Sequence, residues 1–283
     1  MFFIINVICI VSHFKLEAGK MLFLIRDCDV SRFLKSEWKA MQKNVLITGA
    51  AKRIGAACAR LLHSKGCNVF LHYRSSKAAA MQLCYELNQI RPDSSYMMEA
   101  NLLIREELEA LASEACTAWG GIDVLVNNAS SFYPTAIADV TEQQWDELMG
   151  SNLKAPFFLA QSLSATLAEN RGCIVNIVDI HAERGLAGYP VYSIAKAGLV
   201  AMTKILAKEL APSIRVNGVA PGAILWPDKD FSAQEKQDIL QRVALRRSGT
   251  PADIAKAAWF LIKDANYMTG QILTVDGGRT LFY

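Results

Sequence analysis

The sequence predicts an α/β protein built on a single doubly wound parallel sheet of about seven strands, flanked by helices. From Asn44 onward, short apolar runs alternate with longer segments of helical periodicity. Near-continuous apolar runs are typical of parallel strands that are buried on both faces. Right-handed crossovers between such strands produce the doubly wound arrangement. Because no linker interrupts the repeat, we expect one domain over residues 41–283.

Local composition predicts the elements in chain order. The predicted strands are Val45–Thr48, Asn68–His72, Tyr96–Glu99, Val124–Asn127, Ile174–Val178, Arg215–Val219 and Ile272–Val275. Helical periodicity lies between most of them, for example over Ile54–Ser64, Lys77–Gln89 and Glu106–Ala118. Thr141 with Gln144 predicts a capping box at the start of one helix, and Thr250 with Asp253 predicts the N-terminus of another.

The first forty residues do not follow this pattern. Met1–Val11 is apolar, but it lacks the basic start and the small-residue cleavage site of a signal peptide, and it is too short to span a bilayer. Met41 stands just before the first predicted strand. We therefore expect residues 1–40 to be a non-native or disordered extension, with a membrane-surface or partner-binding arm as the alternative.

Composition limits the classes of partner. The 283 residues include 30 Lys and Arg against 27 Asp and Glu, and the basic residues are scattered, so no footprint for nucleic acid is present. Seven cysteines at irregular spacings, without a CxxC pair, indicate free thiols. We expect a cytoplasmic protein without a disulfide framework, a metal site or a membrane partner.

A glycine-rich turn follows the first predicted strand, where residues 48–55 are TGAAKRIG. A glycine at the strand end permits a tight turn, and a second permits close packing where the helix begins. The N-terminus of that helix offers free N–H groups and a positive dipole to a pyrophosphate. The pattern predicts a Rossmann-type nucleotide site, with a purely structural turn as the alternative, in which the contacts are Gly49, Lys52, Arg53, Ile54 and Gly55.

The end of the second predicted strand indicates which dinucleotide is bound. NAD sites carry an Asp or Glu there for the ribose hydroxyl. This chain instead has Tyr73, Arg74, Ser75 and Ser76. An arginine and two hydroxyls suit a 2′-phosphate, and no carboxylate is present to repel it. We therefore predict NADPH as the cofactor, with a solvated loop as the alternative.

Tyr192 and Lys196 stand four residues apart, on one face of a predicted helix. A nearby ammonium stabilises a phenolate and lowers the pKa of the tyrosine, so that the phenol can exchange a proton near the working pH. The spacing alone is common on solvated helix faces. Its position after a strand in the second half of a nucleotide-binding sheet favours catalysis.

Taken together, these motifs resemble those of short-chain dehydrogenases/reductases over residues 44–283. The matching segments are TGAAKRIG, NNAS at Asn127–Ser130, Asn152, YSIAK at Tyr192–Lys196, VNGVAPG at 216–222 and VDGG at 275–278. The resemblance implies that Tyr192 is the general acid, that Lys196 holds the ribose and that Asn152 anchors a water in a proton relay. It also implies cofactor contacts from Asn101, Leu102, Asn128, Ala129, Ser130, Pro221 and Gly222.

Three positions depart from the family pattern. Arg53 replaces the usual third glycine of the turn, Asn101 replaces an aspartate that faces the adenine, and Asp179 replaces the catalytic serine thirteen residues before the tyrosine. An ionised carboxylate would repel the negative charge that develops during carbonyl reduction. Reduction of a C=N bond instead needs a proton on nitrogen, which Asp179 and Tyr192 could supply together.

Within the family, pteridine reductases are the subgroup that this pattern resembles. They share the arginine of the turn, the end of the second strand, the NNASSF segment and the aspartate. The resemblance implies that Phe132 stacks a pterin against the nicotinamide and that Ser130 and Arg53 bind the ring and the cofactor phosphates. Trp226 is expected to close over the substrate. For Phe132 the alternative is a core or lid aromatic, and for His181 we expect a supporting role in the loop.

The sequence therefore predicts an NADPH-dependent pteridine reductase that acts on a dihydropterin or dihydrofolate. One alternative is an NADPH-dependent carbonyl reductase, such as a 3-oxoacyl-(acyl-carrier-protein) reductase. The other is a non-enzymatic NADPH-sensing protein, which the presence of Asn152, Tyr192 and Lys196 disfavours. The resemblance also implies a homotetramer built on the helix of Tyr192 and the region Trp145–Gln161.

Overall fold

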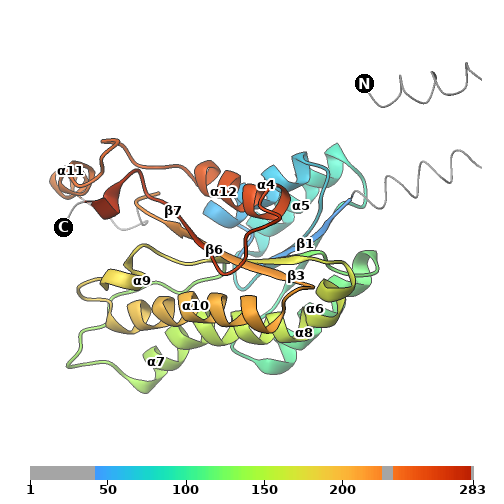
Figure 1. Cartoon of the computed structure of the whole chain (residues 1–283), viewed down its shortest axis with the longest axis horizontal. Helices are drawn as coiled ribbons and strands as arrows, with labels where there is room; N and C mark the ends of the chain where they lie inside the picture. The colour runs from blue at the N-terminus through green and yellow to red at the C-terminus, as the bar shows by residue number, and fades with distance from the viewer. Residues whose placement is uncertain (1–41, 225–231, 282–283) are drawn as a thin grey trace, which may run out of the picture. The chain divides into compact units, whose positions relative to one another are not determined.

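The computed structural model describes residues 42–224 and 232–281. Most of these residues form one α/β unit, in which a seven-stranded sheet lies between two layers of helices (Figure 1). The expected extension over residues 1–40 lies outside the described residues, as does Trp226, so both remain predictions.

All strands of the sheet pair in parallel, in the order β3-β2-β1-β4-β5-β6-β7. The strands are β1 (Asn44–Ile47), β2 (Asn68–Tyr73), β3 (Ser95–Glu99), β4 (Val124–Asn127), β5 (Cys173–Ile177), β6 (Arg215–Pro221) and β7 (Ile272–Val275). The chain reverses its direction of winding between β1 and β4, and ligands of such sheets bind at the carboxyl edge beside that reversal. The predicted doubly wound fold is confirmed.

Helices connect the strands, one of them preceded by a π-helical turn, and a short 3-10 helix follows β7. They are α4 (Arg53–Ser64), α5 (Lys77–Ile90), α6 (Arg105–Trp119), α7 (Glu142–Met149), η1 (Gly150–Lys154), α8 (Ala155–Glu169), α9 (His181–Arg184), α10 (Pro190–Glu209), α11 (Ala233–Gln241), α12 (Pro251–Lys263) and η2 (Arg279–Leu281). Both predicted helix starts are confirmed, since Thr141 with Gln144 and Thr250 with Asp253 form capping boxes.

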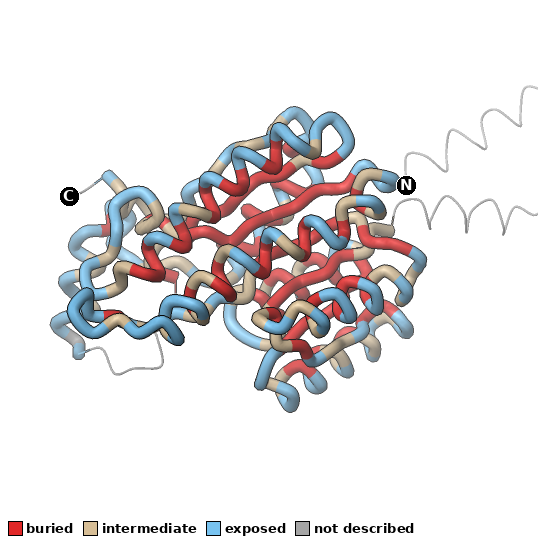
Figure 2. The backbone as a smooth tube through the Cα atoms, turned by 90° about the horizontal axis from the view of Figure 1, so that it is seen from below, coloured by how far each residue is buried: buried red, intermediate tan, exposed pale blue. Residues whose placement is uncertain are grey.

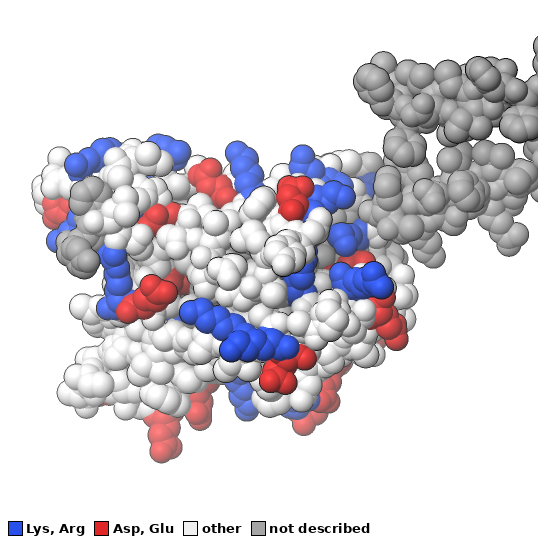
Figure 3. Space-filling view, viewed as in Figure 1, with Lys and Arg blue, Asp and Glu red and all other residues white. Residues whose placement is uncertain are grey.

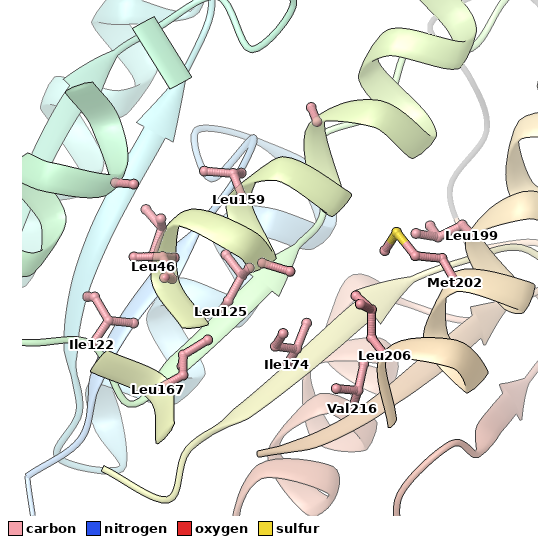
Figure 4. Close-up of a cluster of buried hydrophobic side chains, with 14 of the residues drawn as sticks. Leu46, Ile122, Leu125, Leu159, Leu167, Ile174, Leu199, Met202, Leu206 and Val216 are labelled. Carbon is pink, nitrogen blue, oxygen red and sulfur yellow. The ribbon is translucent and has the colours of Figure 1, made fainter. Parts of the chain in front are cut away.

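Two apolar layers hold these helices on the sheet. Successive strand residues point to opposite faces, so Val45 and Ile47 face α4, α5 and α12, whereas Leu46 faces α6, α8 and α10. Figure 4 shows the second layer, in which strand residues such as Leu125 lie in one cluster with helix residues such as Leu159 of α8. The five inner strands of the sheet are accordingly almost completely buried, whereas the edge strands β3 and β7 are partly exposed (Figure 2). This packing fixes the strand ends from which the site is built.

The predicted element boundaries agree with the structure to within one or two residues, with β6 as the clearest difference. That strand continues past Val219 to Pro221, because Pro221 still pairs with Val275 of β7. The turn η1 is π-helical, which no sequence pattern had indicated. Its five residues follow α7 directly and lead into α8.

The surface carries both signs of charge. Lys and Arg are interspersed with Asp and Glu over the face drawn in Figure 3. Among the described residues, no helix is long and apolar enough to cross a membrane. The same residues contain no group of three or more His, Cys, Asp or Glu side chains that could hold a metal ion.

Candidate active site

The glycine turn between β1 and α4 has a backbone that larger side chains would disrupt. Gly49 adopts a φ of +61°, and a Cβ on it would lie 2.9 Å from the Cα of Ala129. A Cβ on Gly55 would lie 2.2 Å from the carbonyl oxygen of Gly49. Arg53 has a φ of 52°, a left-handed conformation that costs free energy for any residue except glycine. Arg53 therefore adopts a conformation that glycine would adopt more easily.

Asn128 holds this turn from the β4 side. Its Nδ2 donates to the carbonyl oxygens of Thr48 and Gly49, at 2.9 and 3.0 Å. The Thr48 hydroxyl in turn accepts from the backbone N–H groups of Asn128 and Ala129, each at 2.9 Å. Both amide hydrogens of Asn128 are thus engaged in shaping the turn, and its contact with a cofactor stays a prediction.

A cavity of about 190 Å³ lies at the carboxyl edge of the sheet. It brings together the predicted cofactor residues Gly49, Lys52, Tyr73, Arg74, Ser75, Ser76, Asn101, Leu102, Ala129 and Ser130. The remaining predicted contacts lie outside its lining, namely Arg53, Ile54, Gly55, Asn128, Tyr192, Lys196, Pro221 and Gly222. The glycine turn lies at one point of the cavity and leaves room for a pyrophosphate. The Arg74 guanidinium and the hydroxyls of Ser75 and Ser76 lie at another point and suit a second phosphate group.

The Arg74 guanidinium is paired in this structure with the carboxylate of Glu147. Arg74 Nη1 lies 3.3 Å from Glu147 Oε1, and both side chains are partly exposed. Glu147 also accepts hydrogen bonds from the hydroxyls of Ser131 and Tyr133, each at 3.3 Å. An exposed ion pair of this kind contributes at most about 1 kcal/mol. A phosphate dianion can therefore compete with Glu147 for Arg74.

The predicted catalytic residues meet where β5 ends beside α10. The Tyr192 hydroxyl donates to Asp179 Oδ2 at 2.8 Å, and Asp179 Oδ1 accepts from the backbone N–H of His181 at 2.8 Å. Lys196 Nζ donates to the carbonyl oxygen of Ile177 at 2.9 Å and lies 5.7 Å from the centroid of the tyrosine ring. An ammonium has three donors. The described residues engage one of them, which leaves two for the hydroxyls of a ribose.

The pKa of Tyr192 differs from the sequence-based expectation. Burial raises the pKa of the phenol well above its usual range, and the Asp179 carboxylate raises it further. The expected lowering by Lys196 is therefore wrong in this structure, because the charge that contacts the hydroxyl is negative. Burial lowers the pKa of Lys196 to about 8, although Asp179 acts in the opposite direction. At neutral pH the site thus holds an ammonium beside a neutral phenol.

Asn152 lies in the π-helical turn η1, between α7 and α8. Its Nδ2 donates to the carbonyl oxygens of Ser131 and Leu148, each at 2.9 Å, and its Oδ1 accepts from the Ser130 hydroxyl at 2.6 Å. Turns of this kind are frequent at functional sites. The side chain therefore positions Ser130 and Ser131, and its role in anchoring a water stays a prediction.

Phe132 lies against the catalytic tyrosine. Its ring stacks on Tyr189, with centroids 4.6 Å apart and planes 8° apart, and it meets the ring of Tyr192 edge-on at 4.8 Å. The residue is 44% exposed, which does not fit a core aromatic. A flat, accessible ring beside the proton donor suits a planar heterocycle.

Several residues of the site were not predicted from the sequence, and two of them make side-chain contacts that shape it. His72 binds the glycine turn, and Glu147 binds Arg74. A histidine within an apolar strand looks like a core residue in the sequence, and Glu147 lies 73 positions from its partner, so no local pattern connects them. The one available signal was that His72 directly precedes the residues assigned to the cofactor phosphate.

Comparisons with known proteins agree with this geometry. A family model described as enoyl-(acyl carrier protein) reductase matches residues 49–280. The chain belongs to the short-chain dehydrogenase/reductase family, whose members are NAD(P)-dependent oxidoreductases.

Individual relatives point to more than one substrate. Pteridine reductase 1 of Leishmania tarentolae is 38% identical over 278 residues, covering 83% of this chain and 96% of that protein. The 3-oxoacyl-(acyl-carrier-protein) reductase FabG of Staphylococcus aureus is 36% identical over 242 residues, covering 84% and 98%. A blue fluorescent protein from a metagenomic library, solved in complex with NADPH, matches with a TM-score of 0.79 and 32% identity over 84% of this chain and 97% of its own. Because the first two are almost equally similar, the substrate has to be argued from the site.

Proposed function

We propose that this protein is an NADPH-dependent pteridine reductase, which reduces a dihydropterin or dihydrofolate. The observation that carries the proposal is the hydrogen bond of 2.8 Å between the Tyr192 hydroxyl and the Asp179 carboxylate. A serine in place of Asp179 would serve as a neutral donor to a carbonyl oxygen. A carboxyl group joined to the phenol instead forms a short path for a proton, which a ring nitrogen requires.

The proposed reaction converts one C=N bond of the ring into a CH–NH unit. NADPH would supply the hydride that the carbon takes up, from C4 of its nicotinamide. The nitrogen takes its proton from the Tyr192 hydroxyl, and the Asp179 carboxylate relays a replacement proton from solvent to the phenol oxygen. When ionised, the same carboxylate favours a positively charged ring through its own charge.

The residues around this pair have positioning roles in the proposal. The free donors of Lys196 would hold the nicotinamide ribose, so that the hydride faces the substrate carbon. The ring of Phe132, in edge contact with Tyr192, would stack on the pterin. Asn152 would keep Ser130 in place through the hydrogen bond of 2.6 Å, so that Ser130 can bind the ring and the cofactor phosphates together with Arg53.

The preference for NADPH over NADH is supported by the side chains at the end of β2. Arg74, Ser75 and Ser76 line the cavity, and Lys52 faces it from the glycine turn. A guanidinium with neighbouring hydroxyls is well suited to a 2′-phosphate. The NADPH complex of the metagenomic relative gives independent support for a phosphorylated cofactor.

A comparison of substrates tests the proposal directly. Oxidation of NADPH by the purified full chain is followed with dihydrobiopterin, with dihydrofolate and with an acetoacetyl thioester. We expect kcat/KM for a pterin to exceed that for the thioester by at least about tenfold, because a charged carboxylate opposes the oxyanion of a ketone. Turnover of the thioester alone would contradict the proposal.

The second candidate is a carbonyl reductase, which the similarity to the Staphylococcus aureus enzyme favours. Under that function Asp179 has to be neutral during turnover. Replacement of Asp179 by serine would then raise thioester turnover, whereas the pteridine function predicts that the same change abolishes most pterin turnover.

We further propose that the protein acts in the cytoplasm as a homotetramer. An apolar groove of about 430 Å³ runs between η1, α8 and α10, and its lining includes Leu153, Phe157 and Ile205. Phe157 and Ile205 are 42% and 56% exposed. Exposed apolar surface of this kind is typical of contacts between subunits, and a second copy of the chain presents the same helices in return.

A further inference from the structure

His72, at the end of β2, is almost completely buried, with 2% of its surface exposed. Its Nδ1 accepts a hydrogen bond of 3.0 Å from the backbone N–H of Gly49, and its Nε2 lies 2.9 Å from the carbonyl oxygen of Ala100. A carbonyl oxygen only accepts and an amide N–H only donates. The imidazole is therefore neutral and carries its hydrogen on Nε2.

The ring joins three segments of the cofactor cavity. Gly49 belongs to the turn after β1, His72 to β2 and Ala100 to the loop after β3, and all three line the cavity. The backbone carbonyl of His72 also accepts from the N–H of Ala50 at 2.8 Å. One residue thus binds two successive N–H groups of the glycine turn, and its ring sets the distance from that turn to the loop.

The opposite side of the turn is already fixed. Asn128 binds it from β4, because its Nδ2 donates to the carbonyl oxygens of both Thr48 and Gly49. On the β2 side the hydrogen bond to His72 opposes movement of Gly49. An apolar side chain in place of His72 would leave the N–H of Gly49 without that acceptor, which is costly for a buried group.

We propose that His72 is a positioning residue for the nucleotide cofactor. Its Nε2–H tautomer holds the glycine turn and the loop after β3 at the separation that the nucleotide requires. The cofactor then binds to a preformed site rather than one that must be ordered on binding. This role depends on the cofactor and not on the identity of the reduced substrate, so it can hold or fail separately from the pteridine function.

Substitutions of His72 test the two halves of the bridge. In His72→Asn the carboxamide oxygen takes the place of Nδ1 and can accept from Gly49, whereas in His72→Gln the amide reaches toward Ala100 instead. His72→Leu has neither group. The matched control is His63→Leu, because His63 is also buried, has its Nε2 2.7 Å from the Ser94 hydroxyl, and lies outside the cofactor cavity.

The readouts are the Kd of NADPH by fluorescence titration and the denaturation midpoint of the full chain, both at pH 7.5. We expect His72→Leu to raise Kd by about tenfold or more, whereas His72→Asn and His72→Gln, which each keep one half of the bridge, should raise it by about threefold. His63→Leu is expected to lower the midpoint without changing Kd.

Two results would overturn the proposal. One is a Kd for His72→Leu that equals that of the unchanged protein, or that is matched by His63→Leu. The other is an unchanged Kd in both His72→Asn and His72→Gln, and this result remains decisive if the leucine variant does not fold. Catalytic turnover is not needed for either measurement, so failure of the pteridine function leaves the test intact.

Discussion

Asp179 is the residue that distinguishes this site chemically. Tyr192 and Lys196 are motif residues of a large family, whereas Asp179 places a carboxylate 2.8 Å from the phenol oxygen. Burial raises the pKa of that phenol, and the carboxylate raises it further. A neutral phenol that is already hydrogen-bonded to a carboxylate is poorly suited to act as a base. It is well suited to pass a proton toward a substrate nitrogen.

Replacement of Asp179 by asparagine tests that role. The amide preserves shape and can still accept from Tyr192, but it cannot return a proton, so we expect kcat for dihydropterin to fall by about 10²- to 10⁴-fold. The Kd of NADPH should change by less than about threefold, since Asp179 does not line the cofactor cavity. Single-turnover kinetics and fluorescence titration measure the two quantities. A kcat within about threefold of the unchanged enzyme would remove Asp179 from the proton path.

Under the proposed function, the preference for NADPH over NADH also depends on a single residue, Arg74. We expect Arg74→Leu to weaken NADPH binding by about 10- to 100-fold, since a charged hydrogen bond to the phosphate is lost, and to leave NADH binding within about twofold. As the paired variant, Glu147→Gln frees Arg74 and should tighten NADPH binding by about two- to fivefold. Titrations of the unchanged protein and both variants at one ionic strength give the dissociation constants of the nucleotides. Equal losses of affinity for NADPH and NADH would show that Arg74 does not bind the 2′-phosphate.

At the scale of elements, turns rather than regular helices and strands set the geometry. The glycine turn brings β1, β2 and β4 together through hydrogen bonds to His72 and Asn128. The π-helical turn η1 allows Asn152 to reach Ser130 and Ser131. Helical periodicity predicted the neighbouring helices well, because it depends on residues a few positions apart. It contained no signal for η1, whose shape depends on partners in another segment.

Because of His72 at the end of β2, the free energy of unfolding should depend on pH. Burial lowers the pKa of His72 to about 4 from 6.5, the charge of Arg74 acts in the same direction, and the carbonyl of Ala100 opposes both. The unfolded chain therefore binds the proton more readily, so the contribution of His72 to stability is constant above pH 6.5 and is lost as the pH falls from 6.5 toward 4. The full effect is about 3 kcal/mol.

Denaturant unfolding at several values between pH 7.5 and pH 4.5 measures this loss. Burial lowers the pKa of His63 as well, so both histidines contribute with the same sign. His72→Gln should therefore flatten the dependence on pH without removing it. An unchanged slope in this variant would contradict the assignment to His72.

At the scale of the whole molecule, the sheet brings distant parts of the chain to one edge. The cofactor cavity uses the ends of β1 to β4, whereas the Tyr192 and Asp179 pair stands beyond β5. The two apolar layers that cover the sheet hold these parts in register. The same architecture leaves the groove on α8 and α10 exposed, which the proposed tetramer would cover.

A charge placed in that groove tests the assembly. Ile205 is 56% exposed, so Ile205→Glu should cost the isolated subunit little stability but should disrupt a contact made with a second copy. We expect light scattering to show a tetramer for the unchanged chain and a smaller species for the variant. Ile137→Glu is the control, since Ile137 is 83% exposed and lies outside the groove. A tetramer that persists in Ile205→Glu would place the interface elsewhere.

Local sequence is sufficient to predict the strands and helices along the chain, the glycine turn, and the placement of Tyr192 and Lys196 on one helix face. Each depends on periodicity, steric demand or the repeat of one helix, all of which act over a few residues. The partners of His72 and Arg74 and the raised pKa of Tyr192 emerge only in the folded chain. They depend on burial and on the charges of other elements. Both arise only when segments that are far apart in the sequence pack together, so local sequence patterns do not predict them.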